Sequence, residues 1–346
     1  MIKHYLYILL MAAIICTSAT AHGQDSFKAI ALPQNINSVD EEFSGMTMYN
    51  GRLYLLPQYG DHKETKLNGT FSIYSIVADS IGRVIDKKDT ALTAYKAISV
   101  KKLNQLPDSV KANYEGFEAI TMVNNMVYLS IETDDSYAYC FLLKGTFDTI
   151  KNTITIDPLH FVTLKRPIHI SNAGFESVTW LPKEKKLLAY YEFNAAAKGG
   201  NGYLIDTSFN KTPEQVKTPF LYFRVTDIAA TSDDKIYGIN YFWNGDYNSY
   251  LNNDVLKNQL ENIRKTIPDL NNTVANDPDY LKTNSYNRIV MLNNRKDKQW
   301  KQVTSTFPVL KNNWEGIALY RKGALIITDA NMSGKQLSTF GYVEFE

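Results

Sequence analysis

The chain has 346 residues, and its 37 lysine and arginine residues against 36 aspartate and glutamate residues give a formal net charge of +1 at pH 7. This near-equal number of basic and acidic residues excludes the strongly basic surface that binds a nucleic acid polymer. Beyond the N-terminal segment, no stretch approaches the roughly 18 uncharged residues of a transmembrane helix, so we expect no membrane span.

The N-terminal segment, residues 1–21, has the pattern of a secretory signal. Lys3 precedes an apolar run from Tyr5 to Cys16, and small residues end the segment at Ala19-Thr20-Ala21. This pattern predicts cleavage after Ala21 and an exported protein, periplasmic or secreted. Cys140 is then the single cysteine of the mature chain, so an intrachain disulfide is impossible and a hydrophobic core must supply the stability.

Five segments of the mature chain share one pattern: a polar residue, a short apolar strand, a polar turn and a second apolar strand. They are residues 44–56, 118–130, 176–190, 227–239 and 315–327. This pattern predicts a β-hairpin in each repeat. The repeats begin 74, 58, 51 and 88 residues apart, which is less regular than the period of a linear solenoid.

Further strand-like runs follow each hairpin, at residues 71–77, 139–143, 202–205, 288–292, 300–304 and 340–345. A repeated four-stranded antiparallel unit is the blade of a β-propeller. We therefore predict an all-β fold in which residues 22–346 form one five-bladed β-propeller domain, with six blades as the alternative. The last repeat is one strand short, and residues 27–32 are expected to complete it and close the ring.

The longest interval between repeats contains a predicted helix, within an insertion at about residues 248–285. Leu251, Val255, Leu260, Ile263 and Ile267 fall on one helical face, Asn248 or Ser249 can cap the start, and Pro268 ends the helix. We expect this insertion to leave the second strand of blade four and to lie over one face of the propeller. A packing role is the more common use of such a helix.

The first strand of each propeller blade lines the central axis, so the residues that open the five repeats should converge. They are Ser44, Glu118, Glu176, Asp227 and Glu315. Converging carboxylates repel and raise each other's pKa unless a cation joins them. Oxygen ligands in a flexible shell suit Ca²⁺, and the lack of histidine and cysteine argues against zinc and copper. The alternative is that these side chains satisfy backbone donors at the strand starts.

A second polar set should surround the same mouth, because the second strand of each hairpin ends beside the start of the first. Its members are Gln58, Glu132, Glu192, Asn240 and Asp329. The adjoining loops carry Tyr59, His62, Asp134, Tyr137, Phe193, Trp243, Asp246 and Tyr247. We predict a small-molecule pocket formed by Gln58, Tyr59, Tyr137, Asn240 and Trp243. Glu132, Glu192, Asp329 and His62 are the candidates for acid–base catalysis.

The order of the ring residues resembles that of the calcium-activated nucleotidase (apyrase) family, which are secreted five-bladed propellers with a calcium ion in the channel. The matching segments include Phe117-Glu118-Ala119-Ile120, Phe175-Glu176-Ser177-Val178 and Trp314-Glu315-Gly316-Ile317. The last of these is also similar to strands of the esterase-like phytase and SdiA-regulated propellers. The nucleotidases place arginines after the second strands of blades one and three, whereas this chain has Gln58 and Glu192 there. The resemblance therefore implies the calcium site but not the nucleotidase activity.

These features lead to two hypotheses for the function. The first is an exported, calcium-binding propeller that binds a small polar ligand at the channel mouth and hydrolyses an ester or a phosphoester. The second is a non-enzymatic propeller, with a structural calcium ion, that binds a ligand or a protein. In both we expect a monomer.

Overall fold

The computed structural model describes residues 27–39, 41–60, 67, 71–168, 170, 172–194, 201–252, 277, 279–304, 313–330 and 337–345. The predicted signal, residues 1–21, and the candidate His62 lie outside this range, as does most of the predicted helix. Within it, no helix is long and apolar enough to cross a membrane.

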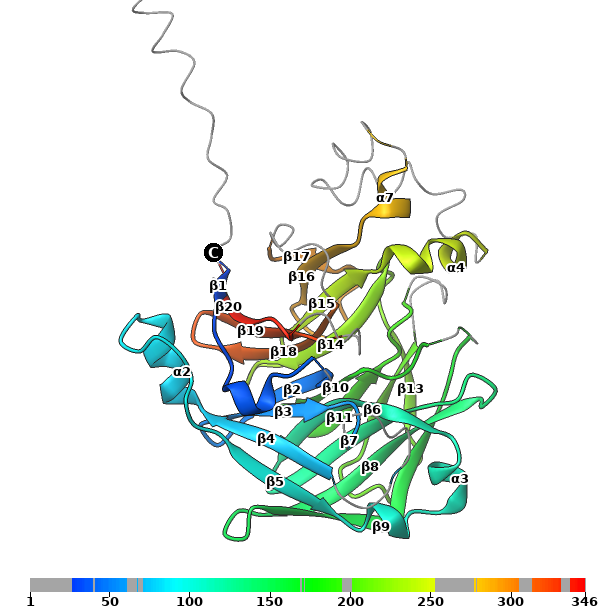
Figure 1. The fold of residues 1–346 in the computed structure, drawn as a ribbon. Coiled ribbons are helices and arrows are strands. Elements are labelled where there is room, and N and C mark those ends of the chain that lie inside the picture. The colour runs from blue at the N-terminus through cyan, green and yellow to red at the C-terminus, as the bar shows by residue number, and fades with distance from the viewer. Residues whose placement is uncertain are drawn as a thin grey trace, which may run out of the picture.

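The strands form five four-stranded antiparallel blades (Figure 1). Blade one contains β2 (Phe43–Tyr49), β3 (Arg52–Pro57), β4 (Phe71–Val77) and β5 (Lys96–Lys101), and blade two contains β6 (Tyr114–Val123), β7 (Met126–Thr133), β8 (Tyr139–Asp148) and β9 (Thr153–Lys165). Blade three contains β10 (Ser177–Leu181), β11 (Lys186–Tyr190), β12 (Asn201–Ile205) and β13 (Glu214–Lys217). Blade four contains β14 (Arg224–Ala230), β15 (Ile236–Phe242), β16 (Tyr286–Leu292) and β17 (Lys301–Gln302). Blade five contains β18 (Trp314–Tyr320), β19 (Gly323–Thr328), β20 (Phe340–Glu344) and the N-terminal β1 (Lys28–Ala29).

The first strands of the five blades close a ring. Strand β2 contacts β6, β6 contacts β10, β10 contacts β14, β14 contacts β18, and β18 returns to β2. The ring is fastened by β1, which pairs with β20 near the C-terminus through Lys28 opposite Tyr342 and Ala29 opposite Gly341. The predicted five-bladed propeller and its closure by the N-terminal strand are therefore confirmed. The parallel pairing of β5 with β9, which joins the outer edges of blades one and two, was not predicted.

Local sequence sets the first hairpin turn in blades one and two. In blade one, Asn50 and Gly51 have φ angles of 45° and 71°, and in blade two, Asn124 and Asn125 have φ angles of 50° and 60°. Two consecutive residues with positive φ are the requirement of a tight type I′ turn, which asparagine and glycine tolerate best.

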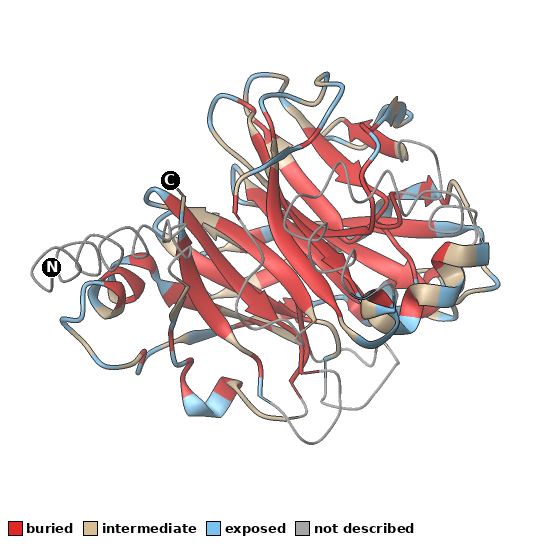
Figure 2. Cartoon of the chain, turned by 90° about the horizontal axis from the view of Figure 1, so that it is seen from above, coloured by how far each residue is buried: buried red, intermediate tan, exposed pale blue. Residues whose placement is uncertain are grey.

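The hydrophobic core lies between adjacent blades, and buried residues make up most of the inner strands, whereas the outer strands, such as β13 and β17, are largely exposed (Figure 2). The largest aromatic group packs where blades three and four meet. It includes Phe193, Phe223, Phe242 and Tyr250, with the Phe193 and Tyr250 rings centred 4.5 Å apart. This packing holds the start of the blade-four insertion against the propeller.

Helices are few among the described residues. The insertion leaves β15 through η4 (Asn244–Asp246) and α4 (Tyr247–Asn252), and it returns through α7 (Tyr280–Thr283) to β16. Its position after the second strand of blade four is as predicted. Leu251 packs against the core as expected, whereas Val255, Leu260, Ile263, Ile267 and Pro268 lie outside the described residues. The short helices η1 (Gln34–Ile36), η2 (Leu103–Gln105) and α3 (Asp108–Lys111) lie in connections.

One helix in blade one was missed by the sequence analysis. Helix α2 (Ala78–Ile85) follows β4 directly, and it buries Ala78, Ile81, Gly82 and Ile85. These positions have the i, i+3, i+4, i+7 spacing of a helical face, so the signal was present in the sequence. Gly82 leaves room for the end of the Arg321 side chain, because a Cβ there would lie 2.5 Å from Nη2 of Arg321.

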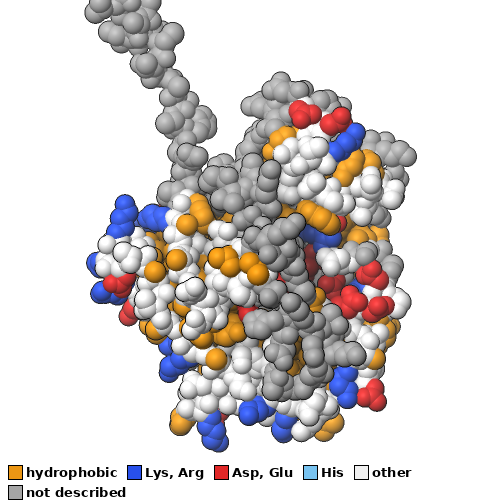
Figure 3. Space-filling view, viewed as in Figure 1, with side chains coloured by type: hydrophobic (Ala, Val, Ile, Leu, Met, Phe, Trp, Pro, Cys, Tyr) orange, Lys and Arg blue, Asp and Glu red, His pale blue; other side chains and the backbone are white. Residues whose placement is uncertain are grey.

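Charged side chains of both signs lie on the visible face of the molecule. In Figure 3, basic side chains lie mostly toward the left and bottom of the visible face, and acidic side chains mostly toward the right.

Candidate functional site

A β-bulge near the start of four inner strands determines which side chains face the channel mouth. The pairing with the second strand skips one residue in each case: Ser44 in β2, Glu118 in β6, Thr226 in β14 and Glu315 in β18. In blade three, Glu176 directly precedes β10. A bulge re-aims the extra side chain. The structural ring is therefore Ser44, Glu118, Glu176, Thr226 and Glu315, and the member from blade four lies one residue before the predicted Asp227.

Asp227 has a different position and different partners. Its carboxylate accepts hydrogen bonds from the backbone N–H of Ile228 at 2.8 Å and of Ile317 at 2.9 Å. Burial raises the pKa of Asp227, and backbone hydrogen bonds, one of them from Met46, oppose this. The side chain thus joins β14 to β18 and β2, which is the structural role considered as the alternative for the ring residues.

The ring hydroxyls also join neighbouring blades. Ser44 Oγ donates to the carbonyl oxygen of Phe117 at 2.5 Å, and Thr226 Oγ1 donates to that of Trp314 at 2.6 Å. Each acceptor directly precedes a ring glutamate. These bonds fix the backbone from which Glu118 and Glu315 project.

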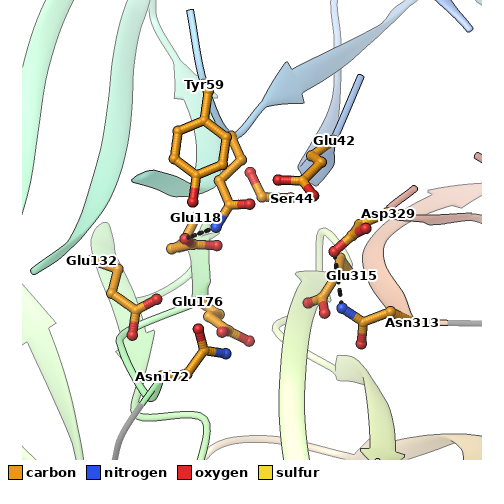
Figure 4. A pocket seen from close by; sticks show the side chains of 11 residues that line it. Glu42, Ser44, Tyr59, Glu118, Glu132, Asn172, Glu176, Asn313, Glu315 and Asp329 are labelled. Atoms are coloured by element: carbon orange, nitrogen blue, oxygen red, sulfur yellow. Dashed lines mark hydrogen bonds between the residues drawn. The ribbon is translucent and has the colours of Figure 1, made fainter. Parts of the chain in front are cut away.

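The remaining ring acids lie around a cavity of about 250 Å³ at the channel mouth. Figure 4 shows side chains from all sides of this cavity turned toward a common space. Its lining consists of Glu42, Ser44, Gln58, Tyr59, Glu118, Glu132, Asn172, Glu176, Asn313, Glu315 and Asp329.

The carboxylates of this cavity are buried with few compensating partners. Glu118, Glu132, Glu176 and Glu315 are each no more than 8% exposed. Burial, reinforced by the neighbouring carboxylates, raises the pKa of Glu118, Glu176 and Glu315 well above the ordinary value. The same causes raise the pKa of Glu132 to about 8, although Arg166 and Arg224 oppose them.

Among the described residues, no hydrogen-bond donor reaches Glu132 Oε1, Glu176 Oε2 or Glu315 Oε2, but Glu132 Oε1 lies 3.9 Å from Nη2 of Arg166 in a buried ion pair. The ring acid Glu118 is different, because its Oε1 accepts a hydrogen bond from Gln58 Nε2 at 2.7 Å (Figure 4). An unpaired buried carboxylate oxygen is costly, so the free oxygens of Glu176 and Glu315 indicate a partner that binds from the cavity.

Only some members of the predicted second polar set line the cavity. Gln58, Glu132 and Asp329 line the cavity, and Asp329 accepts a hydrogen bond from Asn313 Nδ2 at 3.0 Å. Glu192 and Asn240 are fully buried and do not line it. Asn240 instead donates to the carbonyl oxygens of Tyr222 and Arg224 and accepts from Arg288. The prediction that Asn240 lines the ligand pocket is therefore wrong, and its side chain has a structural role.

Glu192 belongs to a buried ion-pair network centred on Arg224. The Arg224 guanidinium lies 2.7 Å from Glu192 Oε2 and 2.6 Å from Asp246 Oδ2, and it also donates to the carbonyl oxygen of Asn172. The other oxygen of Glu192 accepts from the Gly174 backbone N–H. Both oxygens of this catalytic candidate are thus occupied.

A second cavity of about 670 Å³ adjoins the first. Its lining consists of Asn172, Glu176, Arg224, Tyr241, Trp243, Asp246, Asn313 and Glu315, and four of these residues also line the first cavity. The two cavities therefore form one continuous site.

Two of the predicted pocket aromatics reach this site. Tyr59 lines the first cavity and Trp243 lines the second. Tyr137 lines neither, because its ring packs against Tyr139 and Phe141. Its predicted place in the pocket is therefore corrected.

Four residues that line the two cavities were not predicted from the sequence: Glu42, Asn172, Asn313 and Tyr241. A signal for two of them was present: Glu42 and Asn313 stand two positions before the ring residues Ser44 and Glu315. Glycine occupies that position in blades two and three. At Gly116 a Cβ would lie 2.6 Å from Gln58 Cγ, so the missing side chain makes room for Gln58.

In the part of the chain described by the structure, no group of three or more histidine, cysteine, aspartate and glutamate side chains is arranged to hold a metal ion as it stands. The ring acids surround the cavity without converging on one point.

Comparison with known proteins identifies no family for this chain. No family model matches it, and no curated protein matches it. The solved structures that resemble it include native Bacillus subtilis arabinanase Arb43A, at 12% identity over 92% of this chain and 97% of that one, with a TM-score of 0.49. They also include CoXyl43, a GH43 β-xylosidase/α-arabinofuranosidase from a compost microbial metagenome, at 9% identity over 92% and 95% of the two chains, with a TM-score of 0.49.

A GH43_1 enzyme from Xanthomonas citri is similar at 10% identity over 91% of this chain and 90% of that one, with a TM-score of 0.47. Likenesses of this size do not bear on what the chain does, and the fold assignment rests on the strand pairing above. The resemblance to the calcium-activated nucleotidases and phytases is not shown by these comparisons and stays a prediction.

Proposed function

We propose that the protein is an exported, calcium-binding propeller that holds a small polar ligand at the channel mouth and hydrolyses it as an ester or a phosphoester. The observation that carries this proposal is the pair of buried carboxylate oxygens, Glu176 Oε2 and Glu315 Oε2, that border one cavity and accept no hydrogen bond from the described residues. A cation bound between them would satisfy both at once.

The donor chemistry of the mouth fits Ca²⁺. Glu118, Glu176 and Glu315, with the Ser44 hydroxyl, offer oxygen ligands only, and Ca²⁺ tolerates an irregular shell completed by water. Binding would require these side chains to move closer together. When bound, the ion would polarise a substrate carbonyl or phosphoryl oxygen.

The residues left for acid–base work are Glu132 and Asp329. Both line the first cavity beside the ring, and the raised pKa of Glu132, about 8, suits a group that exchanges a proton near neutral pH. The second cavity offers room for the rest of the substrate.

The calcium part of the proposal is tested by thermal unfolding with and without a chelator. We expect the chelator to lower the Tm and added Ca²⁺ to restore it. At a free Ca²⁺ concentration 100 times Kd, the stabilisation is about 2.7 kcal/mol, which corresponds to a Tm shift of roughly 4 °C for a domain of this size. The double variant Glu118→Gln with Glu315→Gln should lose the response. Asp108→Asn, whose side chain is 98% exposed on α3, serves as the control and should keep it. An unchanged Tm with chelator would overturn the calcium proposal.

A second candidate function, a non-enzymatic binding propeller with a structural calcium ion, is favoured by the partners of the polar groups. The Ser44 and Thr226 hydroxyls hold neighbouring backbones, and Glu192 is fixed by Arg224 and Gly174. A panel of nucleotide, phosphomonoester, lactone and aryl-ester substrates, each with and without Ca²⁺, separates the two functions. Turnover that Glu132→Gln abolishes supports the hydrolase, and a lack of turnover on every substrate supports the binder.

A further inference from the structure

Trp243 is unusual among the tryptophans of this chain. It is 53% exposed although it lines the second cavity, whereas Trp300 and Trp314 are buried. Its six-membered ring lies against Gly245, where a Cβ would come within 2.5 Å of Cη2 and Cζ2. The glycine therefore supports the ring, which is placed as one wall of the cavity.

The segment that carries this ring is anchored from both sides. Asp246 is ion-paired with the buried Arg224, with Nε and Oδ2 separated by 2.6 Å. Tyr250, four residues later, is fully buried between Phe193, Phe223 and Phe242. Trp243 thus stands on an anchored segment, and it lines the same cavity as the ring acids Glu176 and Glu315.

The charged side chains that line the two cavities determine which ligand can bind beside Trp243. Seven carboxylate residues and one guanidinium line the two cavities among the described residues: Glu42, Glu118, Glu132, Glu176, Asp246, Glu315 and Asp329, with Arg224. The guanidinium is already paired with Glu192 and Asp246. The lining therefore has many more acidic than basic side chains.

We propose that the second cavity binds an organic cation, an ammonium or quaternary ammonium group, between the face of Trp243 and the carboxylates of Glu176 and Glu315. Tryptophan has the most favourable aromatic face for a cation, and the free Oε2 atoms of the two glutamates supply the opposite charge. Both glutamates are more than nine-tenths buried. The inference rests on the proposed ligand-binding role of the mouth, but it does not require Ca²⁺, which would compete with the organic cation for the same two carboxylates.

The same features disfavour an anionic group in this cavity. A phosphate or carboxylate would approach Glu176, Glu315 and Asp246, and Arg224 has no charge left to balance it. A cationic substituent on the ester would instead be attracted, so the proposed substrate class is an ester that carries a positively charged nitrogen.

The test is calorimetric titration of the full mature chain with choline and with its neutral isostere 3,3-dimethylbutan-1-ol, each in saturating Ca²⁺ and in chelator. We expect choline to bind about tenfold more tightly than the isostere, which has the same shape without the charge. Trp243→Ala should lower the affinity for choline about tenfold, and Gly245→Ala should lower it by displacing the ring. Trp180→Ala, at the opposite end of the channel, should leave it unchanged.

Equal affinity for choline and the isostere, no choline binding by the wild-type chain, or unchanged binding by Trp243→Ala would each overturn the inference. Thermal unfolding of Trp243→Ala, with its Ca²⁺ response intact, confirms that the variant is folded. Choline discrimination without any chelator response would remove the calcium proposal alone. A chelator response without choline discrimination would remove the organic-cation site alone.

Discussion

The two ends of the channel are formed by the same five inner strands, but they differ in chemistry. At the strand starts, carboxylates and amides surround a cavity of about 250 Å³. At the strand ends, a cavity of about 300 Å³ is lined largely by apolar side chains, among them Met48, Met122, Trp180 and Leu319. The bulges contribute to the difference, because those in β2, β6 and β18 turn Ser44, Glu118 and Glu315 into the mouth.

The position of a residue along an inner strand therefore decides whether its side chain lines the mouth or the far cavity. Glu315 and Ile317 are two residues apart in β18, yet one lines the mouth and the other lines the far cavity. Substitutions at the far end should affect stability alone, whereas substitutions at the mouth should affect both stability and ligand binding.

The largest expected effect comes from breaking the buried ion pairs beside the mouth. Arg224→Leu leaves Glu192 and Asp246 buried without their cation, so we expect the free energy of unfolding to fall by about 3–5 kcal/mol, measured by urea denaturation. Arg295→Leu, which removes a partly exposed pair with Glu184, should cost less than about 1 kcal/mol. Equal losses in the two variants would contradict the network assignment.

The far end is tested by Ile317→Ala. This side chain is fully buried, so its truncation should lower the free energy of unfolding by about 2–5 kcal/mol. The Tm shift on adding Ca²⁺ should stay the same as in the wild-type chain, since the mouth is untouched. A lost Ca²⁺ response in a folded Ile317→Ala variant would show that the two ends are not independent.

Glu41 is a buried acid that lines neither cavity, so it tests burial by itself. Burial raises its pKa to about 7, partly opposed by a hydrogen bond with Tyr74. Because the folded state holds this proton more tightly than the unfolded state, stability should fall as pH rises from about 4.5 to 7 and then level off, by up to about 3 kcal/mol. Comparing the pH dependence of urea unfolding for the wild type and Glu41→Gln isolates this group. A pH profile unchanged by the substitution would contradict the assignment.

The smallest effect is expected from Glu315→Gln in chelator, and its sign is opposite to that of Ile317→Ala. Removing a buried charge with an unpaired oxygen should raise the free energy of unfolding by about 1 kcal/mol. Adding Ca²⁺ should then narrow or reverse the difference from the wild type. Destabilisation in chelator would indicate that Glu315 has a structural partner in the folded chain.

Much of the fold could be predicted because its signals are local. The apolar strand pairs and the turns at Asn50-Gly51 and Asn124-Asn125 determine hairpins wherever they stand, and their repetition determines blades. The closing strand was also predictable, because the last repeat is one strand short. Helix α2 was missed although its buried positions have helical spacing.

The site was only partly predictable from the sequence. Glu118, Glu176 and Glu315 were found from the repeat, as were Glu132, Asp329 and Trp243. The sequence did not show that Thr226, and not Asp227, occupies the ring position of blade four. A bulge adds one residue to the strand there, and the period-two pattern of a strand does not reveal a bulge.

By itself, the sequence determined the repeated hairpins and the acidic character of one channel end, since both depend on residue type and short spacing. Only the tertiary structure decided that Asp227 binds backbone amides, that Arg224 neutralises Glu192, and that Trp243 borders the acids. These outcomes depend on which blades become neighbours, and contacts between blades set the partner of every buried charge.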